Sequence, residues 1–218
     1  MQAKMKYKAV IFDLDGTLLD TLQDLAGSVN HALRMYAGMT RDVDQIRSFV
    51  GNGVRTLMTR SLPGGQGNPR FEEAFAEFKA HYAVHCHDAT KPYPGIAEML
   101  QCLASVGYKL AIVSNKTDPE VKKLNDMYFH GLFSSALGER EGTARKPAPD
   151  MLCQAAGGLG VRIEEAVYVG DSEVDIQTAR NAGMDCIAVS WGFRSREWLK
   201  TEGARVVIDD PAMLPALL

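Results

Sequence analysis

The 218-residue sequence predicts a doubly wound, Rossmann-like α/β core with a mostly parallel sheet and an inserted all-helical cap domain. Short apolar runs without in/out alternation recur along the chain and, from residue 94 onward, alternate with helical patterns; such runs are typical of parallel strands covered on both faces. Between residues 19 and 90 only helical periodicity is found. We therefore expect a core of residues 1–18 and 91–218 and a cap of residues 19–90.

Buried apolar runs mark the strands of the core. The predicted strands are Ala9–Phe12, Leu110–Val113, Phe133–Leu137, Ala166–Val169, Cys186–Val189 and Val206–Ile208. Apolar residues that share one face of a predicted helix between the first two strands are Ile96, Met99, Leu100 and Leu103. Pro94 lies near the first turn of this helix, and Gly107 is a suitable stop. This alternation predicts right-handed βαβ units.

Two helical faces define the cap. The first comprises Leu22, Leu25, Ala26, Val29, Leu33 and Tyr36, and the second Phe71, Phe75, Phe78 and Tyr82. The segment PGGQGNP (63–69) reads as a loop or turn, and no convincing strand lies in the insertion.

Composition excludes several classes of protein. Lys and Arg total 24 against 27 Asp and Glu, a net charge of −3 without a basic cluster, so no nucleic-acid partner is expected. No run of 18 apolar residues and no signal-peptide core appears, so no membrane partner is expected. The four cysteines (Cys86, Cys102, Cys153 and Cys186) form no CxxC pair and are interpreted as reduced, packed thiols. We expect a cytoplasmic protein, either a monomer or a homodimer.

Polar side chains follow three of the predicted strands. Asp13 follows the first strand, Ser114 and Asn115 the second, and Gly170 and Asp171 a third. Because ligands of open α/β sheets sit beyond the carboxyl ends of strands, we expect these side chains to share one site.

These residue types suit a phosphate ester bound with Mg²⁺. Asp13 and Asp171 can supply carboxylates to the metal, and Asp15 a backbone carbonyl. Ser114 and the Asn115 amide can donate hydrogen bonds to phosphoryl oxygens, and Lys146, just before another predicted helix, can place a positive charge on them.

The stretch FDLDGTLLDT (12–21) holds two carboxylates two residues apart. One can attack phosphorus and form an aspartyl-phosphate. The other can protonate the leaving alcohol and later accept a proton from water. Their proximity favours the different protonation states that this cycle requires.

Four ordered segments, FDLDGTLLDT, VSNK, RKPAPD and VGDSEVDIQTARNAG, resemble the haloacid dehalogenase-like hydrolases over nearly the whole chain. The resemblance implies that Asp13 is the nucleophile and Asp15 the general acid/base. It also implies that Ser114 and Lys146 bind phosphate, Asp171 binds Mg²⁺, and Asp175 supports Lys146 or the metal shell. Family members that cleave carbon–halogen bonds lack the second Asp, so Asp15 favours phosphoryl transfer.

Substrate choice is expected to lie in the cap. SFVGNGVRTLMTRSL (48–62) resembles the cap segment of the phosphoglycolate phosphatase-like subgroup, as do YPGIAEMLQCLASVGYKLAIVSNK and VSWGFRSREWL elsewhere in the chain. Asn52 and Gly53 form the turn that is expected to approach substrate. Arg55 and Lys116 are candidates for binding the carboxylate of phosphoglycolate.

Several alternatives stay open. Similar sequences include phosphatases for pyrophosphate and sugar phosphates and a β-phosphoglucomutase-like mutase, and a non-catalytic phosphate-ligand binding protein could share the fold. The mutase branch carries a cap-hinge histidine, whereas His31 here reads as a packing residue. His81 and His85 have the i, i+4 spacing of a zinc pair, but no second ligand cluster accompanies them, so packing is the preferred interpretation.

Overall fold

The computed structural model describes residues 6–218. It divides the chain into two compact units. The core unit consists of Met1–Leu19 and Pro92–Leu218, and the cap unit of Asp20–Lys91.

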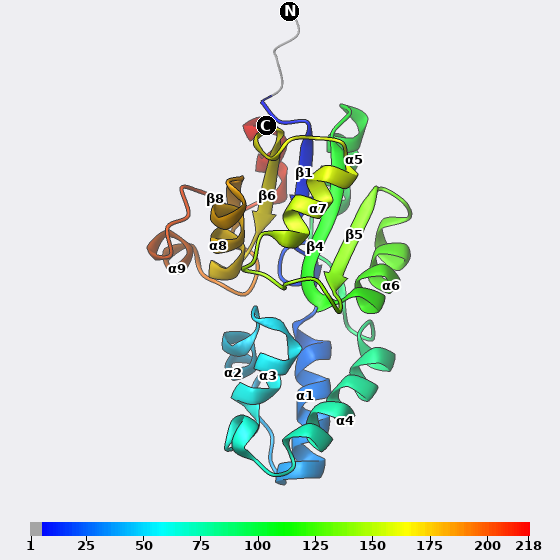
Figure 1. Cartoon of the computed structure of the whole chain (residues 1–218), viewed down its shortest axis with the longest axis vertical. Helices are drawn as coiled ribbons and strands as arrows, with labels where there is room; N and C mark the ends of the chain where they lie inside the picture. The colour runs from blue at the N-terminus through cyan, green and yellow to red at the C-terminus, as the bar shows by residue number, and fades with distance from the viewer. Residues whose placement is uncertain (1–5) are drawn as a thin grey trace, which may run out of the picture. The chain divides into compact units, whose positions relative to one another are not determined.

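The core unit is built on a parallel sheet of six strands in the order β5-β4-β1-β6-β7-β8 (Figure 1). The strands are β1 (Ala9–Phe12), β4 (Lys109–Thr117), β5 (Ser135–Glu139), β6 (Ala166–Gly170), β7 (Asp185–Val189) and β8 (Val206–Ile208). The predicted fold class is therefore confirmed.

Four predicted strands differ in extent from those observed. β6 ends one residue later than predicted, at Gly170, and β7 begins one residue earlier, at Asp185. β4 was expected to end at Val113 but continues to Thr117, so Ser114 and Asn115 lie within the strand. The pairing of β4 with β5 is irregular between Val113 and Thr117, which allows polar side chains in this stretch to face the site. β5 begins two residues later than the apolar run, at Ser135.

The strand order reverses between β1 and β6. β1 pairs on one side with β4, which matches Phe12 to Ile112, and on the other with β6, which matches Phe12 to Val169. The Asp13 N–H continues this ladder by donating to the Val169 carbonyl at 2.8 Å. Asp13 therefore lies at the topological switch point, where ligands of doubly wound sheets bind.

Helices cover both faces of the sheet. The core helices are α5 (Ile96–Ser105), α6 (Asp118–Phe129), α7 (Asp150–Gly158), α8 (Glu173–Ala182) and α9 (Arg196–Thr201), with 3-10 turns η2 (Ile163–Glu165) and η3 (Pro211–Leu217). In Figure 1, α7 and α8 lie in front of the sheet, and α5 lies behind it. Met151 and Leu152 of α7 pack against Ile11 and Val113 on the strands that carry the site.

The cap unit is helical, as predicted. Its helices are α1 (Leu22–Ala37), α2 (Val43–Phe49), α3 (Gly53–Ser61) and α4 (Phe71–His85), with a 3-10 turn, η1 (Gly65–Gly67), in the predicted loop. The buried Asp24 carboxylate of α1 accepts from the Ala89 and Thr90 N–H groups at 2.9 and 2.8 Å. The unit boundaries fall in two short paired strands that periodicity did not reveal, β2 (Leu19–Asp20) and β3 (Lys91–Pro92).

The cysteine interpretation holds only in part. None of the four cysteines, all of which lie within residues 6–218, forms a disulfide. Cys86 is buried and Cys186 is partly buried, but Cys102 and Cys153 are exposed rather than packed. No helix within residues 6–218 is long and apolar enough to cross a membrane.

Candidate active site

The loop after β1 carries Asp13 and Asp15 and folds tightly on itself. The Leu18 and Leu19 N–H groups donate to the Leu14 carbonyl at 3.0 and 2.9 Å. Gly16 has a φ of 87°, and a Cβ there would overlap the Asp171 carboxylate. The absence of a side chain therefore lets the loop approach the end of β6.

Three buried carboxylates converge at this point. Asp13, Asp171 and Asp175 each offer an oxygen within 4.8 Å of the other two. Asp13 follows β1, Asp171 follows β6, and Asp175 lies in the first turn of α8. Parallel strands end at one edge of the sheet, which explains how residues about 160 positions apart in the chain come together.

Lys146 supplies a buried positive charge to this cluster. Its Nζ lies 2.9 Å from Asp13 Oδ1 and 2.8 Å from Asp175 Oδ1, and the residue is 3% exposed. The Tyr168 hydroxyl accepts a hydrogen bond from the same ammonium at 3.0 Å. Lys146 is therefore held in place by partners just after β1, on β6 and on α8.

Asn115, which was predicted to donate to phosphate, contacts the Lys146 backbone. Its Nδ2 donates to the Lys146 carbonyl at 3.0 Å, and its Oδ1 accepts from the Lys146 N–H at 2.8 Å. These contacts clamp the backbone that carries Lys146, and the bond from the Asn115 amide to phosphate stays a prediction. Ser114 is buried beside it, and its Oγ accepts from the Lys116 N–H at 3.2 Å.

Burial dominates the protonation of the acidic cluster. Desolvation raises the pKa of Asp13 to about 7, although nearby Lys146 lowers it, and Asp175 raises it further. The pKa of Asp171 is raised well above its ordinary value by burial and by Asp175 and Asp13. The pKa of Lys146 is raised because its carboxylate partners outweigh its desolvation. The cluster thus holds three carboxyl groups and one ammonium, which contacts Asp13 and Asp175, so additional positive charge would favour the ionised forms of the carboxyl groups.

The donor set at this edge fits a hard divalent cation. Asp175 is satisfied by the protein, because Oδ1 accepts from Lys146 and Oδ2 accepts from the Ser172 N–H and hydroxyl at 3.1 and 2.6 Å. Asp171 accepts from the Phe193 N–H at 2.7 Å and from Thr17 Oγ1 at 3.4 Å. Oxygen donors at Asp13 and Asp171 with incomplete protein partners are the kind that Mg²⁺ uses.

Asp15 and Lys116, which were predicted to have separate roles, are in direct contact. Lys116 Nζ lies 2.7 Å from Asp15 Oδ1, and both side chains are largely buried. The Lys116 ammonium was a candidate for binding a substrate carboxylate. In the structure it orients the proposed acid/base residue.

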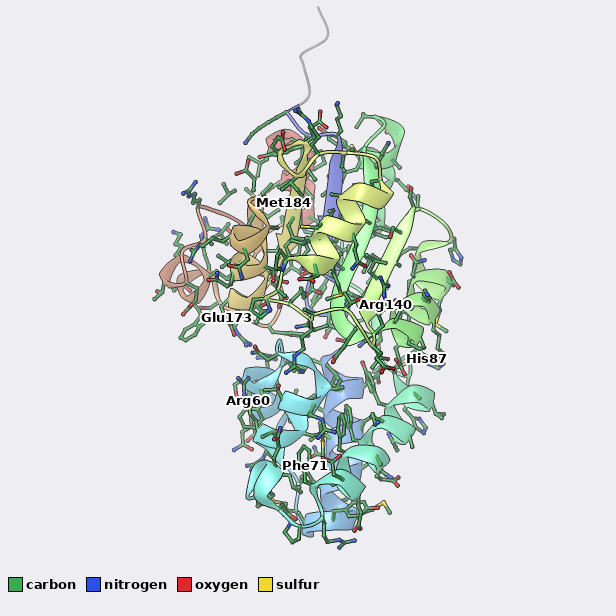
Figure 2. All side chains as sticks on the ribbon, viewed as in Figure 1. Arg60, Phe71, His87, Arg140, Glu173 and Met184 are labelled. Atoms are coloured by element: carbon green, nitrogen blue, oxygen red, sulfur yellow. The ribbon has the colours of Figure 1, made fainter. Side chains whose placement is uncertain are left out.

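The cap candidates form a local cluster within their own unit. Asn52 is the N-cap residue of α3, which begins at Gly53. Arg55 makes a two-pronged ion pair with Glu72 at 2.7 and 3.0 Å, and its guanidinium lies over the rings of Phe71 and Phe75. Figure 2 labels Phe71 in this cluster. Glu72 therefore occupies the guanidinium that was predicted to bind substrate.

The cap histidines stack on one another. The His81 ring lies 4.1 Å from that of His31 and 4.2 Å from that of His85, measured between centroids. Ser28 Oγ contacts His81 Nδ1 at 3.0 Å. Within residues 6–218, the acidic triad is the only group of three or more ligand residues placed to hold a metal. This is consistent with the packing interpretation.

Residue-by-residue reasoning missed Tyr168, Thr17 and the Phe193 N–H. Tyr168 is fully buried on β6, where its hydroxyl lies 3.0 Å from Asp175 Oδ1. Its signal in the sequence is a lone hydroxyl within the apolar run AVYV, since a buried tyrosine hydroxyl requires a polar partner. The backbone contribution of Phe193 leaves no signal in residue identity.

Tyr168→Phe is expected to lower the free energy of unfolding by about 1–3 kcal/mol, because a buried hydrogen bond to charged groups is lost. Urea denaturation measures the change. Tyr108→Phe is the matched control, since its hydroxyl makes no hydrogen bond within the described residues and should change stability by less than about 0.5 kcal/mol. Equal stability of the two variants would contradict the positioning role of Tyr168.

Residues 10–189 match the haloacid dehalogenase-like hydrolase family. A phosphoglycolate phosphatase of Pseudomonas putida is 34% identical over 215 residues, covering 95% of this chain and 79% of the relative. One of Aquifex aeolicus is 34% identical over 188 residues, covering 85% and 86% of the two chains. A crystal structure from Lactobacillus delbrueckii subsp. bulgaricus, of a protein proposed to be a phosphoglycolate phosphatase, aligns with a TM-score of 0.92 at 41% identity, covering 98% of each chain.

Proposed function

The chain belongs to the haloacid dehalogenase-like hydrolases, and on that premise we propose that it is a Mg²⁺-dependent phosphatase that hydrolyses phosphoglycolate through an aspartyl-phosphate on Asp13. The observation that carries this proposal is the position of Asp13. It lies at the switch point of the sheet, paired with the buried Lys146 and beside Asp171. Mg²⁺, held by Asp13, Asp171 and the Asp15 carbonyl, would offset negative charge on the phosphoryl oxygens.

In the first step an Asp13 carboxylate oxygen attacks phosphorus while the bond from phosphorus to the ester oxygen breaks. Asp15 donates a proton to the departing oxygen, so the product leaves as an alcohol. Because Oδ1 of Asp15 contacts Lys116, we assign the proton transfer to Oδ2. Lys146 and Ser114 bind the phosphoryl oxygens throughout.

In the second step water attacks the phosphorus of the aspartyl-phosphate, and its proton passes to Asp15. The bond between phosphorus and the Asp13 oxygen breaks, which releases phosphate and restores both carboxyl groups. Asp175 and Tyr168 act by holding the Lys146 ammonium in place rather than by touching substrate.

Phosphoglycolate is proposed as the substrate because relatives at 34% identity are phosphoglycolate phosphatases. The test is Mg²⁺-dependent phosphate release from phosphoglycolate, pyrophosphate, sugar phosphates and nucleotides. A sharp preference for phosphoglycolate is expected. Broad, weak release would contradict the substrate and retain the phosphatase, whereas no release from any compound would contradict both and favour a binding protein.

Arg55→Ala is expected to raise the KM for phosphoglycolate by roughly 10-fold or more, with little change in kcat, if Arg55 binds the substrate carboxylate through charge-assisted hydrogen bonds. Since Glu72 holds the same guanidinium, Glu72→Gln should lower that KM. Steady-state kinetics with phenyl phosphate, which lacks a carboxylate, should show neither effect. An unchanged KM in Arg55→Ala would remove Arg55 from the site.

A further inference from the structure

A pocket lies in the core unit at the edge of the sheet opposite the acidic cluster. Its volume is about 430 Å³, within the range of small-molecule sites. Asp185 and Val206, which line it, are the first residues of β7 and β8, whereas Asp13 and Asp171 follow strand ends. In Figure 2, Glu173 is the first residue of α8, and Met184, two residues after the helix ends at Ala182, lines the pocket.

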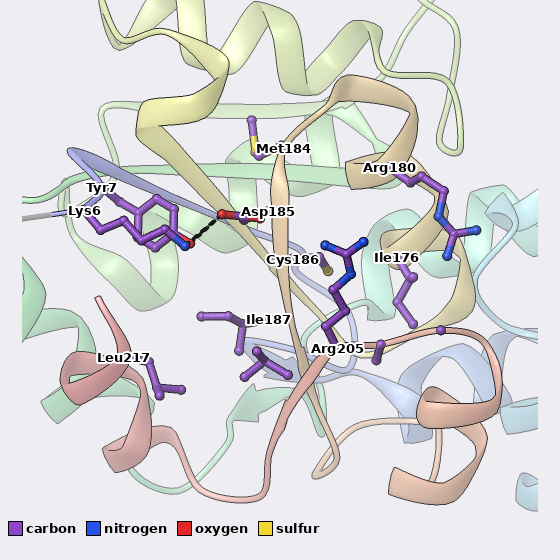
Figure 3. A pocket seen from close by; sticks show the side chains of 13 residues that line it. Lys6, Tyr7, Ile176, Arg180, Met184, Asp185, Cys186, Ile187, Arg205 and Leu217 are labelled. Carbon is purple, nitrogen blue, oxygen red and sulfur yellow. Dashed lines mark hydrogen bonds and ion pairs between the residues drawn. The ribbon is translucent and has the colours of Figure 1, made fainter.

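Charge in this pocket has the opposite sign to that of the chain. Lys6, Arg180 and Arg205 line it with a single carboxylate, Asp185, whereas the whole chain has a net charge of −3. Asp185 is already occupied, because its Oδ2 lies 3.0 Å from Lys6 Nζ and accepts from the Tyr7 hydroxyl at 2.8 Å. Figure 3 shows the Lys6–Asp185 pair as a dashed line.

Neither guanidinium group is hydrogen-bonded to a carboxylate within residues 6–218, although the charge of Arg205 helps to lower the pKa of Asp185. The Arg205 side chain makes no hydrogen bond or ion pair with any residue from 6 to 218. Arg180 has only a long contact, 3.4 Å, to Gln177 Oε1 and no carboxylate among the described residues. In Figure 3 the Arg205 side chain lies between Asp185 and Arg180. Guanidinium groups in this state are suited to binding an anion with two or more oxygens.

The remaining walls are apolar. Val206 and Leu217 are large hydrophobic residues that are 38% and 44% exposed, and both line the pocket together with Ile176, Met184 and Ile187. A ligand with an apolar body would remove this surface from water.

We propose that this pocket binds a small organic anion, whose carboxylate, sulfonate or phosphate head lies between Arg180 and Arg205 and whose apolar body covers Val206 and Leu217. The site is separate from the catalytic edge and does not rest on the proposed phosphatase activity.

The test is an NMR titration of the ¹⁵N-labelled full chain with hexanesulfonate, which no phosphatase hydrolyses. Saturable shifts are expected at the amides of Cys186, Ala204 and Val206. The double variant Arg180→Gln/Arg205→Gln should weaken binding about tenfold or more. Arg162→Gln is the control, because Arg162 is an exposed core-unit arginine outside this pocket, and it should leave the affinity unchanged.

Neutral 1-hexanol tests whether the apolar walls alone are sufficient for binding. It should bind about tenfold more weakly than hexanesulfonate or not at all. The proposal is overturned if hexanesulfonate shifts no amide of the pocket, or shifts only amides near Ser114 and Asp171. It is also overturned if the double variant binds hexanesulfonate as tightly as the native chain does. The same holds if the native chain binds 1-hexanol as tightly as hexanesulfonate. Unchanged spectra elsewhere in the double variant, together with unchanged phosphatase activity, show that the variant is folded.

Discussion

Asp13→Asn is expected to lower kcat at least about 10⁴-fold, because an amide cannot replace the carboxylate nucleophile. The fold should survive. Asn has nearly the same shape, and the backbone bond from residue 13 to Val169 does not involve the side chain. In the metal-free native chain, burial raises the pKa of Asp13 to about 7, so at pH 8 folding buries an ionised carboxylate at a cost in free energy. The uncharged Asn side chain avoids this cost. The Tm of the variant at pH 8 should therefore equal or exceed that of the native chain.

Phosphate release and thermal unfolding of the same preparation measure both effects. Asp126→Asn, which removes an exposed carboxylate from α6, is the matched control and should change neither. Retained turnover in Asp13→Asn with a normal Tm would overturn the proposed mechanism. Mass spectrometry of acid-quenched native protein should place the phosphoryl group on the peptide that contains Asp13.

Mg²⁺ is expected to raise the Tm of the chelator-treated protein, and more so at pH 8 than at pH 5. At about 100 times Kd, mass action adds about 2.7 kcal/mol to the free energy of unfolding. For a chain of this size that corresponds to roughly 5–11 °C. At pH 5 Asp13, with a pKa of about 7, is protonated, so the metal must displace a proton and stabilises less.

The direction in which the free energy of unfolding of the metal-free protein changes with pH follows from the same pKa. Between the ordinary value of 3.8 and about 7, folded Asp13 holds a proton that the unfolded chain has lost. The contribution of Asp13 to the free energy of unfolding therefore falls as pH rises through this window and becomes constant above it. Asp13→Asn should reduce this slope. A Mg²⁺-induced shift that is larger at pH 5 than at pH 8 would contradict the assignment of Asp13 as a ligand.

Features of the fold that depend on local sequence patterns could be predicted from the sequence. β1 was predicted with its observed bounds, because a strand buried on both faces is a continuous apolar run. The placement of Asp13 and Asp171 at one sheet edge followed from parallel strand direction alone. The helices α1 and α4 were predicted by their 3.6-residue periodicity, whereas the two-residue strands β2 and β3 are too short for any period to be recognised.

The partners of individual polar side chains were decided by the tertiary structure. The sequence by itself determined the fold class and the residue types of the site, because burial and strand direction leave periodic and positional signals. It did not determine that Asn115 clamps Lys146, that Lys116 contacts Asp15, or that Glu72 pairs with Arg55. A hydrogen bond forms only over about 3 Å, and the approach of residues 31 or 101 positions apart depends on the packing of every element between them.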